Sequence, residues 1–364
     1  MKVQDIIQYL ERWAPLAIQE PYDNAGLIIG DKNDESSGGL ITLDVTEAVI
    51  KEAVQHNCNL IIAHHPLIFN GIKKIGRSSW MDKCINLAIK HDINIYAVHT
   101  NLDNVLTGVN DKICDLIGLG ERRILLPKPG TLAKLTVFVP PKNKHSLLEA
   151  LFSSGAGDIG NYDHCTFEVS GLGSFRGNEL SNPTLGKKGQ TENVKEDRIE
   201  VILRKHDADQ ILKAMKNAHP YEEVAYYLTD LLNENQSYGS GMVGVLPKPL
   251  KTTDFFQHLK SVLKLQVIRH TEYCREVVSK VAVCGGSGSF LLEAAKKQNA
   301  DVFITADFKY HEFFGADDRI IIADVGHYES EVWTKDLLHE RLSKVFANFA
   351  FRLSRIDTNP IKYL

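Results

Sequence analysis

The sequence predicts an α/β protein in which two similar lobes surround a central cleft and a ferredoxin-like α+β domain is inserted between them. In both terminal parts, short apolar strands alternate with helical segments, which is the pattern of β-α-β units. Residues 128–245 instead follow the order β-α-β-β-α-β of the split ferredoxin-like unit. Residues 293–305 repeat the pattern of residues 52–64, and this weak internal duplication predicts two similar sheets around a shared cleft.

Length and composition set the boundaries of this interpretation. The 364 residues exceed what one ordinary core holds, and we predict a first lobe at 1–127, an inserted domain at 128–245 and a second lobe at 246–364. The net charge of −4 argues against a nucleic-acid partner. The six cysteines are scattered, the N-terminal segment is not a signal peptide, and no apolar run reaches membrane-spanning length. We therefore expect a cytoplasmic protein with no membrane partner.

The first lobe begins with an amphipathic helix at Val3–Trp13, followed by a polar turn and a short strand that ends near Gly30. A second strand, 39–43, precedes a helical segment that either Asp44 or Thr46 could cap. The next strand, 59–63, ends in adjacent histidines.

His64 and His65 are followed at once by Pro66. Ligands of open α/β sheets bind at the carboxyl ends of strands. Neighbouring residues of a regular strand point to opposite faces, so both imidazoles serve one site only if the backbone turns there. Pro66 is suited to such a turn. The alternative is that one histidine packs in the core and the other is solvated.

The following strand, 93–98, ends in His99 and is followed closely by Asp103. His99 could hydrogen-bond a backbone carbonyl, and Asp103 could cap a turn. The position of both residues after a neighbouring strand also makes them candidates for the same site as the two histidines.

The inserted segment has apolar strands of its own at 134–139, 165–175, 199–204 and 224–231, with helices at 144–153 and 207–218. A polar stretch, 181–197, is expected to be a loop. The segment should therefore fold as a domain with its own core.

In the second lobe, the strand 277–284 runs into a glycine-rich turn at 285–289. Such a turn can hold a phosphate on free N–H groups, but the signal is weak without a Walker lysine or the dinucleotide spacing. A later strand ends before His327 and Glu331, whose spacing of four places both on one helical face. Alone, such a pair usually lies on a solvated surface. With the strand-end residues of the first lobe it completes three imidazoles and two carboxylates, which is enough for two ions that share a bridging carboxylate.

Several stretches together resemble the NIF-three-like family, whose members often carry the label GTP cyclohydrolase I type II homologue. They are YDNAGLIIGD, LDVTEAVIKEA, NLIIAHHPLIF, HTNLDN, GSGMVGVLPKPL, DVFITADFKYHE and DVGHYESE. The middle, with HPYEEVAYY, is similar to the PII- and CutA-like domain of the longer bacterial members. The resemblance implies a toroidal homohexamer with inward-facing metal sites. It also implies five metal ligands, namely His64, His65, Asp103, His327 and Glu331, with Glu331 as the bridge.

Mixed imidazole and carboxylate ligands suit zinc, which we expect, with manganese or iron(II) as alternatives. Two such ions favour a metal-dependent hydrolase acting on a nucleotide or another small phosphorylated compound, in line with the GTP cyclohydrolase label. His99 and His311 are the candidates for proton transfer or for orienting ligands, and a structural role remains the alternative for each. Tyr22, Asp23 and Asn24 are candidate rim groups. The competing hypothesis is a regulatory or metal-handling assembly whose PII-like domain senses a ligand and whose ions are structural.

Overall fold

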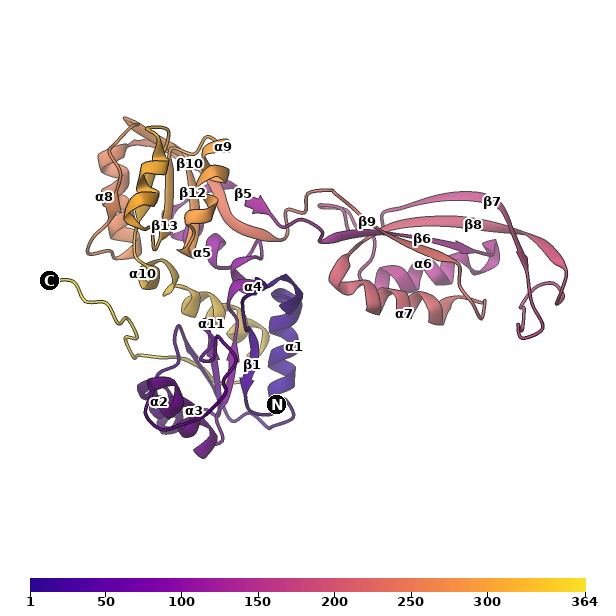
Figure 1. Cartoon of the computed structure of the whole chain (residues 1–364), viewed down its shortest axis with the longest axis horizontal. Coiled ribbons are helices and arrows are strands. Elements are labelled where there is room, and N and C mark those ends of the chain that lie inside the picture. The colour runs from indigo at the N-terminus through magenta and orange to yellow at the C-terminus, as the bar shows by residue number, and fades with distance from the viewer. The chain divides into compact units, whose positions relative to one another are not determined.

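The computed structural model describes residues 1–364 and confirms a mixed α/β protein with several sheets. The chain forms two compact units (Figure 1). The first unit combines Met1–Pro127 with Gln236–Leu364, and the second is Lys128–Asn235. No helix has both the length and the apolar character needed to cross a membrane.

The first unit contains a five-stranded sheet that carries the strand-end histidines. Its strand order is β1-β4-β3-β2-β15, and β2, β3, β4 and β15 run parallel while β1 pairs antiparallel at the edge. These strands are β1 (Gly26–Ile29), β2 (Gly39–Thr42), β3 (Leu60–Ala63), β4 (Asn94–Ala97) and β15 (Phe351–Leu353). Helices α2 (Glu47–Gln55) and α3 (Trp80–Lys90) pack on one face, and α1 (Val3–Trp13) packs on the other.

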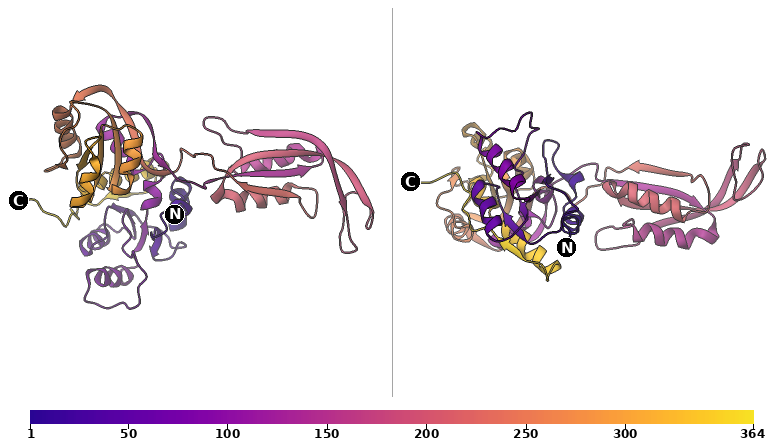
Figure 2. Two further views of the ribbon diagram at one scale, coloured as in Figure 1. Left: turned by 45° about the horizontal axis from the view of Figure 1, so that its top comes forward. Right: turned by 90° about the horizontal axis from the view of Figure 1, so that it is seen from below.

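A six-stranded sheet forms the rest of the first unit, in the order β11-β14-β13-β12-β10-β5. The strands are β5 (Gly120–Pro127), β10 (Gly239–Lys251), β11 (Arg269–His270), β12 (Val277–Ser287), β13 (Val302–Ala306) and β14 (Ile321–Asp324). Figures 1 and 2 show α8 (Thr252–Leu263) and α9 (Leu292–Lys297) on opposite faces of this sheet. Alternation along β12 explains this arrangement, because Val281 and Val283 pack with α8 whereas Ala282 and Cys284 pack with α9.

The two sheets share one hydrophobic core, to which both contribute one face. The helices α4 (Thr100–Asp103), α5 (Val109–Ile117), α10 (His327–Glu331) and α11 (Thr334–Val345) complete this unit. Each sheet includes one strand from the other predicted lobe. β5, from the predicted first lobe, pairs with β10 in the six-stranded sheet, and β15, from the predicted second lobe, pairs with β2 in the five-stranded sheet. The exchange ties the two sheets together along the chain as well as through the core.

The second unit is a four-stranded antiparallel sheet in the order β7-β8-β6-β9, with two helices on one face (Figure 2). Its elements are β6 (Leu132–Val139), α6 (Lys144–Ser153), β7 (Thr166–Arg176), β8 (Thr191–Arg204), α7 (Ala208–Ala218) and β9 (Tyr226–Asp230). The core is formed by residues such as Leu135, Ile199 and Ile211. The prediction of a loop at 181–197 is wrong for its last part, because β8 begins at Thr191. That part of β8 pairs with β7 and exposes polar side chains, so it lacks an apolar pattern.

Candidate metal centre

His64 and His65 stand where β3 ends and the backbone bends toward Pro66. The bend brings both rings to one place, with centroids 5.0 Å apart. His64 Nδ1 donates to the backbone oxygen of Val98 at 2.8 Å, and His64 is fully buried. Because that bond places the proton on Nδ1, the lone pair of Nε2 is directed toward the neighbouring carboxylates.

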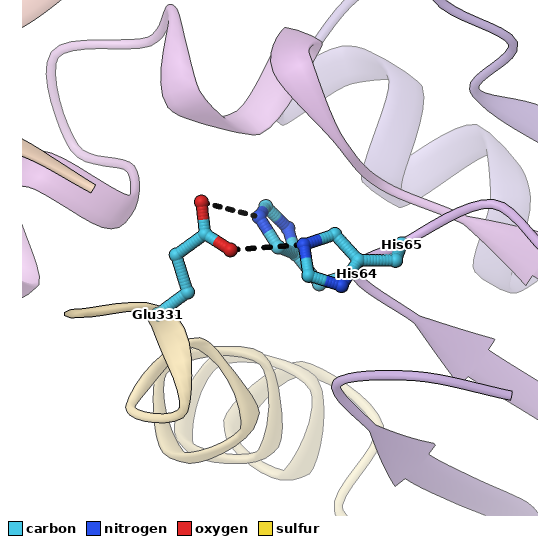
Figure 3. Close-up of side chains that lie close together, drawn as sticks. All are labelled: His64, His65 and Glu331. Atoms are coloured by element: carbon cyan, nitrogen blue, oxygen red, sulfur yellow. Dashed lines mark hydrogen bonds and ion pairs between the residues drawn. The ribbon is translucent and has the colours of Figure 1, made fainter. Parts of the chain in front are cut away.

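Glu331 lies on α10, which follows β14 of the six-stranded sheet, and its carboxylate points toward the two histidines (Figure 3). Its Oε2 lies 2.9 Å from His65 Nε2 and 3.0 Å from His327 Nε2, and its Oε1 lies 3.8 Å from His64 Nε2. The ligand atoms of His64, His65 and Glu331 all lie within 4.8 Å of one another. One carboxylate therefore faces three imidazole nitrogens.

Asp103 adds a second carboxylate, and its distance from His64 can be compared with the spacing of two ligands on one metal ion. Asp103 Oδ1 lies 3.6 Å from His64 Nε2, and both atoms are buried without a hydrogen-bond partner. Buried polar atoms almost always have a partner. Two ligand atoms that each lie about 2.1 Å from one zinc ion are roughly 3–4 Å apart. The spacing and the missing partners both fit a shared cation.

Carboxylates behind the imidazoles fix the ring orientations. His65 Nδ1 lies 2.7 Å from Asp44 Oδ1, and His327 Nδ1 lies 2.6 Å from Asp307 Oδ2. Such a bond holds the tautomer that presents Nε2 to a metal, and it raises the basicity of that nitrogen. Neither role is predicted from the sequence. The sequence offers Asp44 or Thr46 as the cap of α2, and the structure shows that Thr46 accepts the Val49 N–H and caps this helix.

The carboxylates of the cluster favour the protonated, positively charged form of two of its imidazoles. Burial lowers the pKa of His65, but the bonds to Asp44 and Glu331 outweigh burial and raise it to about 9. The pKa of His327 likewise reaches about 11, despite burial, because of Asp307 and Glu331. Burial and the neighbouring charge of Glu331 raise the pKa of Asp103 well above its ordinary value. Positive charge is thus favoured around Glu331.

The prediction of a glycine-rich turn at 285–289 is wrong for its first part, because β12 extends to Ser287. The glycines at the end of this strand make room for Glu331, and their N–H groups are not free. Gly285 N–H donates to Asn110 Oδ1 and Gly286 N–H donates to Ser330 Oγ, each at 2.9 Å. A Cβ on Gly286 would overlap Glu331 Oε1, and the φ of +63° at this residue disfavours a side chain as well. The end of β12 therefore shapes the candidate metal centre.

The remaining candidates divide between two places. His99 lies beside the cluster, with its ring 5.4 Å from that of His64, and its Nδ1 is 2.7 Å from Asp23 Oδ1. His311 is exposed on the 3₁₀ segment Tyr310–Ala316, where its ring contacts Tyr310 and Phe314. The structure does not bring His311 to the centre.

A pocket of about 380 Å³ opens onto the cluster, and both sheets contribute to it. Its polar and ligand-bearing lining includes His65, His99, Asp103, His327 and Glu331, and its mouth includes Tyr22. Of the other expected rim groups, Asp23 instead orients His99, and Asn24 Nδ2 donates to the Ile68 carbonyl. Cys284 also lines the pocket, but burial raises the pKa of its thiol, which disfavours a thiolate ligand.

Comparison with known proteins identifies the family of this chain. Residues 1–360 match the family described as Duf34/NIF3 (NGG1p interacting factor 3). The chain belongs to this family. It is 37% identical over 367 residues to a "GTP cyclohydrolase 1 type 2 homolog" of Halalkalibacterium halodurans, with 99% of this chain and 98% of the relative covered. A relative with the same name in Bacillus subtilis is 36% identical over 370 residues, with 99% and 98% covered.

Solved structures of DUF34/NIF3 relatives have the same fold. The Bacillus cereus protein related to NIF3 matches with a TM-score of 0.86 at 37% identity, covering 100% of this chain and 99% of that one. A Staphylococcus aureus protein matches with a TM-score of 0.80 at 30% identity, with 100% and 99% covered. The names of the curated relatives describe homologues of a cyclohydrolase, so they leave the reaction of this chain to be inferred from its site.

Proposed function

We propose that this DUF34/NIF3 protein is a dinuclear metal-dependent hydrolase that acts on a nucleotide or another small phosphorylated compound. In this proposal His64, Asp103 and Glu331 hold one ion, while His65, His327 and Glu331 hold the other. The observation that carries it is the pair of buried atoms without partners, His64 Nε2 and Asp103 Oδ1, across from a carboxylate that faces three imidazoles. Zinc fits this ligand set best, and manganese or iron(II) are the alternatives.

Each ion in this arrangement has only three protein ligands, so coordination positions stay open toward the pocket. Such ions supply an activated water and stabilise negative charge on an attacked phosphoryl or carbonyl group. The protein's own contribution is to hold the ligand rings rigidly through Asp44 and Asp307. His99, oriented by Asp23 and lining the pocket, is the residue that we assign to proton transfer. We assign no such role to His311.

Phosphate binding decides between catalytic and structural ions. Inorganic phosphate is expected to bind the metal-loaded protein and to lose this binding when the metals are removed, because open positions accept an anion whereas a closed structural site does not. Calorimetric titration of both forms measures the difference, with metal analysis before each titration. Equal phosphate affinity in both forms would contradict the hydrolase and favour a regulatory or metal-handling protein.

In this proposal the second unit is an inserted ferredoxin-like, PII-like domain, and the chain assembles into a hexameric ring with inward-facing sites. Ligand sensing by this domain belongs to the competing regulatory hypothesis. Its separate core and its β-α-β-β-α-β order support the assignment as an inserted domain. The ends of the segment also suit an insertion, since Pro127 in β5 pairs with Gly239 in β10. The chain therefore leaves and re-enters the first unit at neighbouring points.

Deletion of residues 128–235, with a short glycine-serine linker between Pro127 and Gln236, is expected to leave a folded protein that binds metal. The linker would close a hairpin between β5 and β10, and closing a short loop costs little entropy. Circular dichroism and metal analysis of the purified variant test this expectation. A soluble, folded and metal-free variant would instead show that the deleted segment is part of the centre.

A further inference from the structure

We infer that the pocket at the metal centre is built for a planar aromatic compound that carries a single phosphoryl group, the chemistry of a purine nucleoside monophosphate, and that it disfavours a triphosphate. The inference rests on the proposed metal-dependent function and narrows its substrate class. Two features carry it, namely an aromatic mouth and a lining without lysine or arginine.

The aromatic mouth consists of Tyr22, Phe69 and Phe290, which all line the pocket. Their exposed fractions are 62%, 42% and 62%, although large aromatic side chains usually lie inside a protein. The rings of Tyr22 and Phe69 lie 6.1 Å apart, and the ring of Phe69 meets that of His99 edge-on at 5.9 Å. Phe69 is thus held between two rings while it keeps an open surface toward the pocket.

Exposed rings at the mouth of a polar site provide a stacking surface for a flat ligand. Stacking on aromatic side chains is a common way to bind nucleobases and tolerates differences between them. The pocket volume of about 380 Å³ lies within the ~300–1,000 Å³ typical of small-molecule sites. A ring at the mouth would leave its polar substituent directed toward the ligand cluster on the inner wall.

The charges of the lining limit how much negative charge that polar substituent can carry. No lysine or arginine lines the pocket, whereas Glu20, Asp103 and Glu331 do. Further carboxylates, those of Asp44 and Asp307, stand behind the imidazoles. Two divalent ions would bring four positive charges to these five carboxylates, so an anion would be held only by direct contact with the ions, which a single phosphoryl group, carrying about −1.5 to −2 at neutral pH, can make. The additional charges of a triphosphate would meet carboxylates with no lysine or arginine to compensate them.

The test compares guanosine monophosphate, guanosine triphosphate and ribose 5-phosphate by calorimetry on the metal-loaded protein. The monophosphate is expected to bind about tenfold more tightly than ribose 5-phosphate, from stacking, and more tightly than the triphosphate. Phe69→Leu and Phe290→Leu should each lower the affinity for the monophosphate by roughly tenfold and leave ribose 5-phosphate unchanged. Phe314→Leu, which removes an aromatic ring 67% exposed outside this pocket, is the control and should change neither affinity.

The outcomes separate this inference from the function on which it rests. If all three compounds bind in a metal-dependent way with equal affinity, the aromatic mouth is not a stacking surface and the inference fails while the hydrolase proposal stands. Tighter binding of the triphosphate would also overturn it. If the phenylalanine variants alter the oligomeric state and leave the affinities unchanged, the rings are a subunit contact. Absence of binding by every compound would refute both proposals.

Discussion

Glu331→Gln is expected to abolish metal binding at both proposed ion sites. Glu331 is the one residue whose carboxylate faces His64, His65 and His327 together. Glutamine keeps the shape of the side chain but removes the charge that attracts the cations. Removing one partner of a buried charged pair costs about 3–5 kcal/mol, which corresponds to a loss of affinity of a hundredfold or more. Metal analysis after dialysis and competition with a chromogenic chelator would measure the loss.

The matched control for this variant is Glu340→Gln. Glu340 lies on α11, shortly after Glu331 in the chain, but its side chain is 62% exposed and pairs with Lys112 at the surface. Exposed ion pairs contribute little to stability, so this variant should keep its metal and its thermal stability. Circular dichroism should show both variants folded. If the Glu331 variant retains both ions, this carboxylate does not bridge them and the proposed ligand set is wrong.

Gly286→Ala is expected to remove metal binding and to lower the melting temperature, although the substitution adds only one methyl group. The new Cβ would overlap Glu331 Oε1 and would lie 3.3 Å from His327 Cε1. The residue has a φ of +63°, where a side chain adds strain of about 1–2 kcal/mol. The carboxylate must move away from the new methyl group to relieve the overlap, and this movement changes the ligand geometry. Thermal unfolding and metal analysis together measure the effect.

Gly118→Ala separates the overlap from the backbone strain. Gly118 ends α5 with a φ of +83°, but a Cβ there would meet no atom within 4 Å. Its alanine variant should therefore show the strain alone, with a modest loss of stability and an unchanged metal content. Equal metal content in the two variants would mean that Glu331 can shift without losing its ions.

The sequence predicts the individual elements of the fold better than their partners in the sheets. The apolar runs that became β2, β3 and β4 are recognisable because each is buried on both faces, as in parallel sheets. Strand order is a property of the whole chain, and nothing in Phe351–Leu353 indicates that this segment will pair with β2. The sequence does not predict the early part of β8, because its polar side chains face solvent and show no alternation of apolar residues.

The same division holds for the candidate metal centre. His64, His65 and Asp103 attract attention because polar residues follow buried strands, and the structure brings them to His327 and Glu331. Asp307 carries the same signal, because it directly follows the buried strand β13, but its contact with His327 accompanies a left-handed φ of 60° that the sequence does not reveal. The place of His311 depends on the path of a short 3₁₀ segment, which local sequence does not determine.

The sequence separation within the centre has a consequence for how the protein is made. His65 and Glu331 are 266 positions apart, and the whole of the second unit lies between them. On the ribosome, His64, His65 and Asp103 emerge long before Glu331, the carboxylate that completes the proposed ligand set. At about 5–20 residues per second, the wait lasts on the order of ten seconds or more. During that time the nascent chain would offer cations only part of the proposed ligand set, so metal loading of the proposed centre would belong to the end of synthesis, when α10 joins the strand ends.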